Sequence, residues 1–281
     1  MSPISLAAGE YTVDVDAVGA RIASILHAPT GTEYLLTTAW GEEDWGGTYQ
    51  FTGSNEEWHR RYAGGWHTLV PHAGDARTLD RVAHPFHGEA AWRRWRLTEA
   101  DDALCEFAIV LRTAPLTVRR RVTATGTGVL VRQTVWNHSP REAAFTWVEH
   151  PAFGPALIGP GTTVAIGGDR VDARFPEGDE LHSDFQVVRA KGRGTASISN
   201  ADKGTAAVLT WDPEVFPFLF VWQEHRATTG FPWWGTADTI ALEPACRPYE
   251  SDGGPLGPLV LVGGASLAAE FELTCTTEER A

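Results

Sequence analysis

Short apolar runs separated by glycine and proline fill most of the sequence, and no stretch carries a convincing helical repeat. Runs such as 11–15, 104–112 and 195–199 alternate with the two-residue period of strands that bury one face. Two further runs flank Thr125-Gly126-Thr127-Gly128, whose glycines suit a hairpin turn. Closely spaced strands joined by such turns predict an all-β fold, a large antiparallel β-sandwich.

The strand pattern continues along the chain without an internal repeat or a low-complexity linker. Further strands are predicted at 19–26, 33–36, 92–97, 116–123, 129–136, 162–166, 185–190, 206–211, 218–222, 239–242 and 268–274. Residues 41–55 are rich in glycine, acids and aromatics and have no clear period. We predict a long loop there, of the kind that often has a function in a compact domain, such as closing over a pocket. One domain over residues 1–281 is the expected organisation.

Composition and charge exclude several classes of partner. A chain of 281 residues with 43% hydrophobic content can bury a substantial core. The net charge is −13 and no basic block occurs, which argues against nucleic acid or an anionic membrane surface as a partner. Cys105, Cys246 and Cys275 are odd in number and widely spaced, as expected in a reducing compartment. The first residues lack a basic region and a long apolar core, so we expect a cytoplasmic protein without a membrane span.

Two candidate catalytic residues, His150 and Glu243, each stand at the end of an apolar run and directly before a proline. Because proline has no N–H to extend a ladder, we expect both side chains at the rim of a sheet, where a ligand reaches them. Burial there would raise the pKa of the Glu243 carboxyl group, which suits a general base. By strand alternation Glu149 should face away from His150 and be structural or solvated.

Five histidines between Trp58 and Gly88 raise the possibility of a metal site: His59, His67, His72, His84 and His87. Their spacing contains no His-x-His pair, no His-Glu-x-x-His and no partner cysteines. We therefore expect no bound metal, and instead hydrogen-bonding surfaces or half-exposed loop ends, the latter above all for His59 and His84. The neighbouring pair Gly64-Gly65 would let the backbone approach a ligand closely.

Five sequence motifs, spread over nearly the whole chain, occur in the same order as in the aldose 1-epimerases, or galactose mutarotase-like proteins, and resemble the motifs of that family. Residues 19–25 look like the first hairpin of that family, and 64–71 resemble its strand framed by Gly-Gly and Pro. His87-Gly88 is similar to its His-Gly motif, 150–153 to its His-Pro-Tyr-Phe motif, and 242–244 to its catalytic Glu-Pro.

The resemblance implies a galactose mutarotase-like supersandwich that interconverts the α and β anomers of a monosaccharide, as a monomer or homodimer and with no cofactor. Glu243 would take the proton of the C1 hydroxyl while His150 gives one to the ring oxygen. The ring would open, C1 would turn about the C1–C2 bond, and closure on the other face would reverse the proton movements. His87 would hydrogen-bond the same oxygens.

Other residues are predicted to bind the sugar, since indoles stack on the C–H faces of saccharides and polar groups contact hydroxyls. They are Arg61, His67, His72, Trp66, Trp222, Gln223, Trp234 and Arg247. Arg61 is similar to a sugar-binding arginine of the family, and Arg60, Arg61 and Arg247 could instead hold a phosphate.

Two departures from the family pattern keep other functions open. Glu89-Ala90-Ala91 stands where bacterial relatives often carry an aromatic residue and an arginine, and Ala152 replaces a tyrosine, which leaves room in the pocket. One alternative is a divergent isomerase, epimerase or lyase that acts on an oxidised or phosphorylated sugar. Another is a carbohydrate-binding protein without turnover, because a fold does not fix a function.

Overall fold

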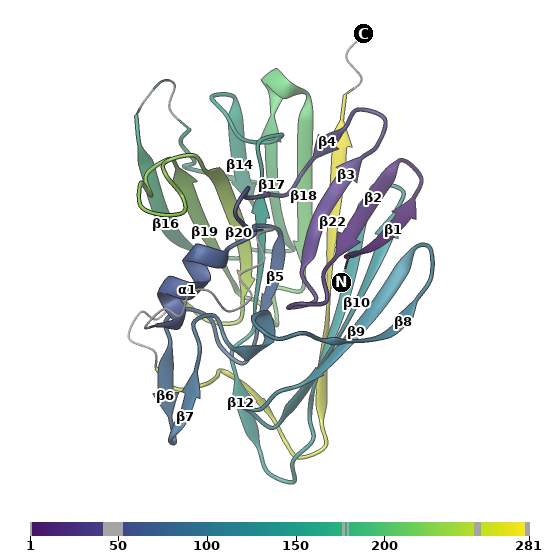
Figure 1. The fold of residues 1–281 in the computed structure, drawn as a ribbon, viewed down its shortest axis with the longest axis vertical. Helices are drawn as coiled ribbons and strands as arrows, with labels where there is room; N and C mark the ends of the chain where they lie inside the picture. The colour runs from purple at the N-terminus through teal and green to yellow at the C-terminus, as the bar shows by residue number, and fades with distance from the viewer. Residues whose placement is uncertain (1, 42–52, 176–177, 179, 250–253, 279–281) are drawn as a thin grey trace.

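The computed structural model describes residues 2–41, 53–175, 178, 180–249 and 254–278. Within them the strands form two large antiparallel sheets, each of nine strands, as the sequence predicts (Figure 1). The first sheet has the order β1 (Ile4–Ala8), β2 (Tyr11–Val15), β3 (Ile22–His27), β5 (Trp66–Leu69), β13 (Val148–Phe153), β20 (Asp238–Ala245), β19 (Phe218–His225), β16 (His182–Arg189), with β4 (Thr32–Glu33) on β3. The second has the order β15 (Asp169–Val171), β14 (Thr162–Ile166), β17 (Gly194–Asn200), β18 (Thr205–Trp211), β22 (Ser266–Thr277), β11 (Gly128–Asn137), β10 (Leu116–Thr125), β9 (Leu104–Val110), β8 (Arg96–Ala100).

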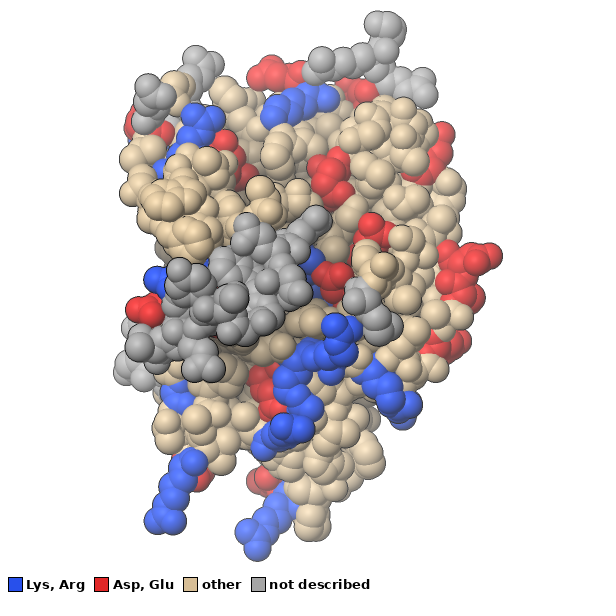
Figure 2. Space-filling model, in the orientation of Figure 1, with Lys and Arg blue, Asp and Glu red and all other residues tan. Residues whose placement is uncertain are grey.

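Smaller elements cover the ends and one face of the sandwich. They are the strand pairs β6 (Arg77–Leu79) with β7 (Val82–His84) and β12 (Ala143–Phe145) with β21 (Leu259–Leu261), the helix α1 (Ser54–Arg61), and 3₁₀ turns at Glu89–Ala91 and Ala201–Lys203. In Figure 1 α1 lies beside the middle of the first sheet. Figure 2 shows that this side of the molecule carries acidic side chains along one edge and basic side chains lower down.

Alternate residues of the strands fill the space between the two sheets. Ile22 and Ile25 of the first sheet and Val118 and Val131 of the second are fully buried in one apolar cluster. This alternation is the physical basis of a sandwich, since each sheet covers the apolar face of the other. The hairpin between β10 and β11 is confirmed, with Thr125 paired to Gly128.

The centre of the first sheet is buried on both faces, because a second cluster covers the face turned away from the other sheet. On β20, Ile240 and Leu242 join the inter-sheet core, whereas Ala241 and Ala245 join the second cluster with Trp58 of α1. Strands buried on both faces lose the polar alternation that marks a solvated face. The outer face is where the cavity described below lies.

A buried ion pair ties this central region to the second sheet. Arg120 Nη1 donates to Glu149 Oε2 at 2.8 Å and to Gln133 Oε1 at 2.9 Å, and both ion-pair side chains are 0% exposed. The indole N–H groups of Trp66 and Trp147 donate to the same carboxylate at 2.7 and 2.8 Å. Glu149 is therefore structural and faces away from His150, as predicted, but it is fully buried rather than solvated.

The helix α1 was not predicted. It has only eight residues with one buried apolar side chain, Trp58, so it carries no apolar stripe that a sequence window can detect. Of the predicted loop 41–55, residues 42–52 lie outside the described residues, and Ser54 and Asn55 already belong to α1.

Candidate active site

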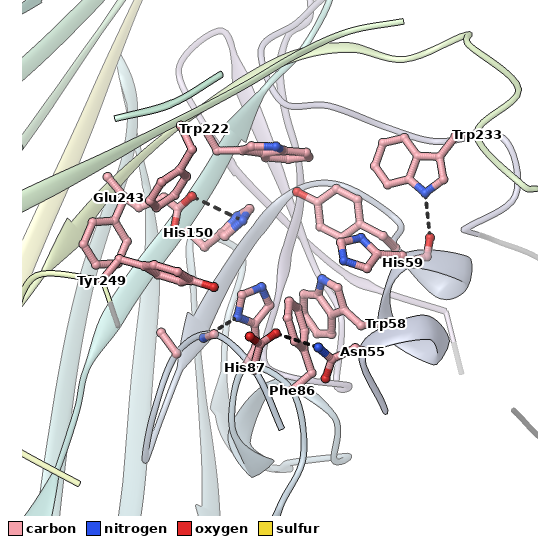
Figure 3. A pocket seen from close by; sticks show the side chains of 16 residues that line it. Asn55, Trp58, His59, Phe86, His87, His150, Trp222, Trp233, Glu243 and Tyr249 are labelled. Atoms are coloured by element: carbon pink, nitrogen blue, oxygen red, sulfur yellow. Dashed lines mark hydrogen bonds and ion pairs between the residues drawn. The ribbon is translucent and has the colours of Figure 1, made fainter. Parts of the chain in front are cut away.

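A cavity of about 440 Å³ opens on the outer face of the first sheet (Figure 3), a volume suited to a small molecule. Its described lining is mostly aromatic, with a few polar groups. The lining residues are Asn55, Trp58, His59, Tyr62, Ala73, Gly74, Asp75, Phe86, His87, His150, Phe185, Phe220, Trp222, Trp233, Glu243 and Tyr249. The three predicted catalytic residues, His87, His150 and Glu243, are therefore brought into one cavity.

Strand register explains how His150 meets Glu243. On one side of β13, His150 is the direct partner of His67 on β5. On the other side, the ladder with β20 pairs Val148 with Ala245 and Ala152 with Ala241. The same register, continued between these two pairs, sets His150 opposite Glu243. Cross-strand neighbours share a face of the sheet, so the two side chains enter the cavity together.

The prolines have a different effect from the predicted one. Pro151 and Pro244 lie inside β13 and β20, and both strands continue beyond them, so His150 and Glu243 are not at the rim of the sheet. Each proline lacks only its own N–H, and β13 stays paired to β5 on its other side, where Ala152 N donates to Gly65 O at 3.0 Å. The prolines therefore coincide with a local gap in the β13–β20 ladder, in the middle of the sheet.

Burial sets the electrostatics of the pair. His150 Nε2 lies 3.5 Å from Glu243 Oε1, and each side chain is 6% exposed. Desolvation raises the pKa of the Glu243 carboxyl well above its usual range and lowers the pKa of His150 to about 4. The environment thus favours a protonated carboxyl beside a neutral imidazole. This pair contains one proton donor and one proton acceptor, which is what acid and base catalysis requires.

His87 is held as a hydrogen-bond donor. Its Nδ1 accepts the N–H of Gly74 at 3.1 Å, which leaves the proton of the neutral ring on Nε2. Burial and the neighbouring histidine His150 lower the pKa of His87 well below its usual range, and the two ring centroids are 5.8 Å apart. The backbone of His87 has a φ of 62°, an unfavourable value for histidine that is often found at functional sites. Gly88 allows this turn, because a Cβ there would lie 2.7 Å from the carbonyl oxygen of Val70.

Aromatic rings form the rest of the wall. Trp222 lies 5.9 Å from the His150 ring between centroids, so this predicted sugar-binding residue does line the cavity. Tyr62 packs against both Trp222 and Trp233, at 6.1 and 5.8 Å. Figure 3 shows Trp58 and Phe86 beside His87, on the side of the cavity away from Trp222. Such ring faces suit the C–H surface of a sugar.

Three of the predicted sugar-binding residues point elsewhere. Trp66 is fully buried in the inter-sheet core, because alternation on β5 turns it away from the cavity. Gln223 follows Trp222 and faces the other way, where its amide contacts the backbone of Arg174. Trp234 is 65% exposed and packs on Phe231, whereas its neighbour Trp233 lines the cavity.

The two predicted arginines also lie away from the described lining. Arg61 forms an ion pair with Glu57 one turn earlier on α1. Arg247 donates to the carbonyl oxygen of Pro255 at 2.8 Å and borders a small neighbouring pocket. Their positions depend on the geometry of a helix and a loop, which cannot be predicted from the spacing of residues in the sequence.

Of the four remaining histidines of this segment, three are buried rather than half-exposed at loop ends. His67 packs behind the cavity and contacts the carbonyl oxygen of Gly64 at 3.1 Å. His72 and His84 pack on each other with centroids 5.6 Å apart, and His84 is 3% exposed, so its prediction was wrong. His59 is exposed and lines the cavity. Among the described residues no group of three or more His, Cys, Asp or Glu side chains is arranged to hold a metal ion.

The glycine pair and the two departures also have structural explanations. A Cβ on Gly64 would lie 2.0 Å from the carbonyl oxygen of Leu36, so the pair approaches neighbouring backbone and not a ligand. Glu89 is buried away from the cavity, where it accepts the N–H groups of Arg112 and Thr113 at 2.7 Å. Ala152 is fully buried in the outer-face cluster, and so it does not widen the described cavity.

Several of the lining residues were not predicted from the sequence. Three of them lie on α1 or at its end, a helix that the strand pattern does not indicate: Asn55, Trp58 and Tyr62. Phe220 could be predicted from the sequence, since it lies two residues before Trp222 and therefore on the same face of β19. Cavity residues on loops, such as Asp75 and Tyr249, carry no periodic signal.

Solved structures with the same fold include a galactose mutarotase-like protein from Lactobacillus casei, with 18% identity and a TM-score of 0.70 over 98% of this chain and 100% of that one. A galactose mutarotase related enzyme from Lactobacillus acidophilus has 14% identity and a TM-score of 0.72, over 98% and 97%. A GalM/aldose epimerase homologue from C. elegans has 11% identity and a TM-score of 0.67, over 98% of both chains. No protein-family model matches the chain, and neither does any curated protein. The predicted fold is confirmed: the chain is a galactose mutarotase-like β-sandwich. In the described part of the chain, no helix is long and apolar enough to cross a membrane.

Proposed function

We propose that this chain, which has the galactose mutarotase-like fold, is an aldose 1-epimerase that interconverts the α and β anomers of a monosaccharide. The observation that carries the proposal is the His150–Glu243 pair, 3.5 Å apart and buried in a cavity of small-molecule size. A carbohydrate-binding protein without turnover has no need of a buried acid and base beside each other.

In the proposed reaction Glu243 and His150 act on the two oxygens of the anomeric centre. One removes the proton of the C1 hydroxyl and the other protonates the ring oxygen as the C1–O5 bond breaks, which gives the open-chain aldehyde. Rotation about C1–C2 and attack of the C5 hydroxyl on the other face of C1 return both protons. No redox change or group transfer occurs, so an acid and a base suffice.

His87 would steady this exchange. Its Nε2–H is available as a donor because Nδ1 is held by Gly74. A donor of this kind stabilises the negative charge that builds up on a sugar oxygen during proton transfer. Trp222 would stack on the sugar ring and hold it against the pair.

A phosphorylated or oxidised sugar fits the cavity less well. The described lining contains neither lysine nor arginine, and anionic groups are held in proteins mainly by these residues. Arg60, Arg61 and Arg247, the arginines predicted to hold a phosphate, lie outside that lining. The charges therefore favour a substrate without an anionic group.

Anomer exchange is the direct test. Freshly dissolved α-glucose and α-galactose are followed by polarimetry with the wild-type protein, Glu243→Gln and His150→Asn. We expect catalysis by the wild type and a loss of about 10²- to 10⁴-fold in each variant. If all three proteins and buffer alone equilibrate every sugar tested at one rate, the proposal is wrong.

A further inference from the structure

The described wall of the cavity contains acidic residues but no lysine or arginine. The acids are Asp75 and Glu243, and burial favours the protonated, neutral form of Glu243. His87 and His150 are kept neutral by burial, which lowers the pKa of both.

Asp75 is the acidic residue that the proposed reaction does not use. Its Oδ1 accepts a hydrogen bond from the Asn55 amide at 2.6 Å, and Asn55 lies next to His87 in Figure 3. None of the ion pairs formed among the described residues includes Asp75. Asn55 supplies one neutral donor, so the carboxylate oxygens of Asp75 can accept further hydrogen bonds.

The walls around Asp75 suit a cation. Tyr249 stands over the same loop, since a Cβ on Gly74 would lie 3.1 Å from its ring. Trp58, Phe86 and Trp233 line the cavity as well. Aromatic faces attract ammonium groups through their negative quadrupole, and a carboxylate nearby adds a charged hydrogen bond. Such walls also accept the C–H face of a sugar ring, so one ligand can use both properties.

We propose that the substrate is a monosaccharide that carries a protonated amino group, and that the Asp75 carboxylate is its counter-ion. This assignment rests on the proposed function, because it concerns the sugar that the same cavity turns over. The preferred substrate is then an amino sugar, and neutral hexoses are slower substrates of the same site.

Anomer exchange measured on matched sugars tests this inference. Saturation-transfer NMR gives kcat/KM for glucosamine, galactosamine and 6-amino-6-deoxyglucose, with glucose, galactose and N-acetylglucosamine as neutral counterparts. The variant is Asp75→Asn, which retains an oxygen to accept the Asn55 hydrogen bond. Asp102→Asn, an exposed residue in the turn between β8 and β9, removes the same charge at a distance from the cavity and is the control.

We expect at least one amino sugar to exceed its neutral counterpart in kcat/KM by about tenfold or more, the scale of a hydrogen bond to a charged group. Asp75→Asn should reduce that ratio toward one, and Asp102→Asn should leave it unchanged. If neutral hexoses are turned over but no amino sugar is preferred, or if the preference survives in Asp75→Asn, this inference is overturned while the proposed function stands. If no sugar in the panel is accelerated over buffer, both proposals fail.

Discussion

The buried Glu149–Arg120 pair offers the sharpest test of how the fold holds His150. In Glu149→Gln, the new side chain keeps one oxygen, so only one of the indole N–H groups of Trp66 and Trp147 retains its acceptor, and the charge is lost. Arg120, which is 0% exposed, is then left as a buried cation without its anionic partner. Removing one partner of a buried pair costs about 3–5 kcal/mol.

The same contacts predict the effects of other substitutions. Glu149→Leu would also leave two indole donors unpaired, at about 1–3 kcal/mol each, and would consume most of a typical stability of about 5–15 kcal/mol. Arg120→Met leaves the carboxylate with the two indole donors and without its cation. The double variant Arg120→Met/Glu149→Gln removes both charges, so its destabilisation should be well below the sum of the single variants.

Urea unfolding followed by tryptophan fluorescence gives these free energies of unfolding. We expect Glu149→Gln to lose about 3–5 kcal/mol and to lower kcat for anomer exchange, because His150 is the next residue on β13. A loss below about 1 kcal/mol in Glu149→Gln, or additive effects in the double variant, would show that the buried ion pair does not hold this part of the fold.

Other outcomes follow from the cavity and the histidines around it. Burial lowers the pKa of His150 and His72 to about 4 from 6.5, so the unfolded chain binds protons that the folded chain does not. The stability that each contributes is fully present above pH 6.5 and is lost as the pH falls toward 4, by roughly 3 kcal/mol for each residue, and urea unfolding across this range should show a loss of that size. His87→Gln should reduce kcat about tenfold to a hundredfold, less than Glu243→Gln, because a donor is lost and not the acid–base pair; an unchanged kcat would remove His87 from the mechanism. Trp222→Ala should raise KM about three- to tenfold; Trp66→Phe, which loses the N–H donated to Glu149 and part of a fully buried ring system, should lower stability and leave KM unchanged. The opposite pattern would mean that Trp66 faces the sugar.

The fold was predictable because strand alternation is a local signal. The β10–β11 hairpin and strands such as β2 and β14 were readable from their own residues. Alternation also placed Glu149 opposite to His150. The helix α1 was not readable, since its short amphipathic pattern rests on the single buried residue Trp58.

The candidate site was predictable only in part. His87, His150, Glu243 and Trp222 do meet in one cavity. However, Pro151 was taken as the end of a strand, and only the register between β5, β13 and β20 shows that it lies in the middle of a sheet. Register between distant segments depends on the packing of the whole chain, and the sequence of one strand does not contain it.

Which tryptophans and histidines lie on the cavity side depended on one-residue differences in position. Trp66 and His67 are neighbours on β5, and only the second lies on the cavity side of the sheet. Trp233 and Trp234 differ in the same way within a turn, where no period applies. If the alternation along a strand is assigned with a shift of one residue, every side chain is predicted on the wrong face of the sheet.

The central claim is that His150 and Glu243 act together as acid and base on the anomeric centre. Saturation-transfer NMR at equilibrium measures exchange between the α and β signals of a sugar and needs no fresh anomer. We predict fast exchange with the wild-type protein, and slow exchange with Glu243→Gln, with His150→Asn and with the double variant, whose loss should be no larger than that of the more damaged single variant. Exchange at the wild-type rate in either single variant would contradict the account.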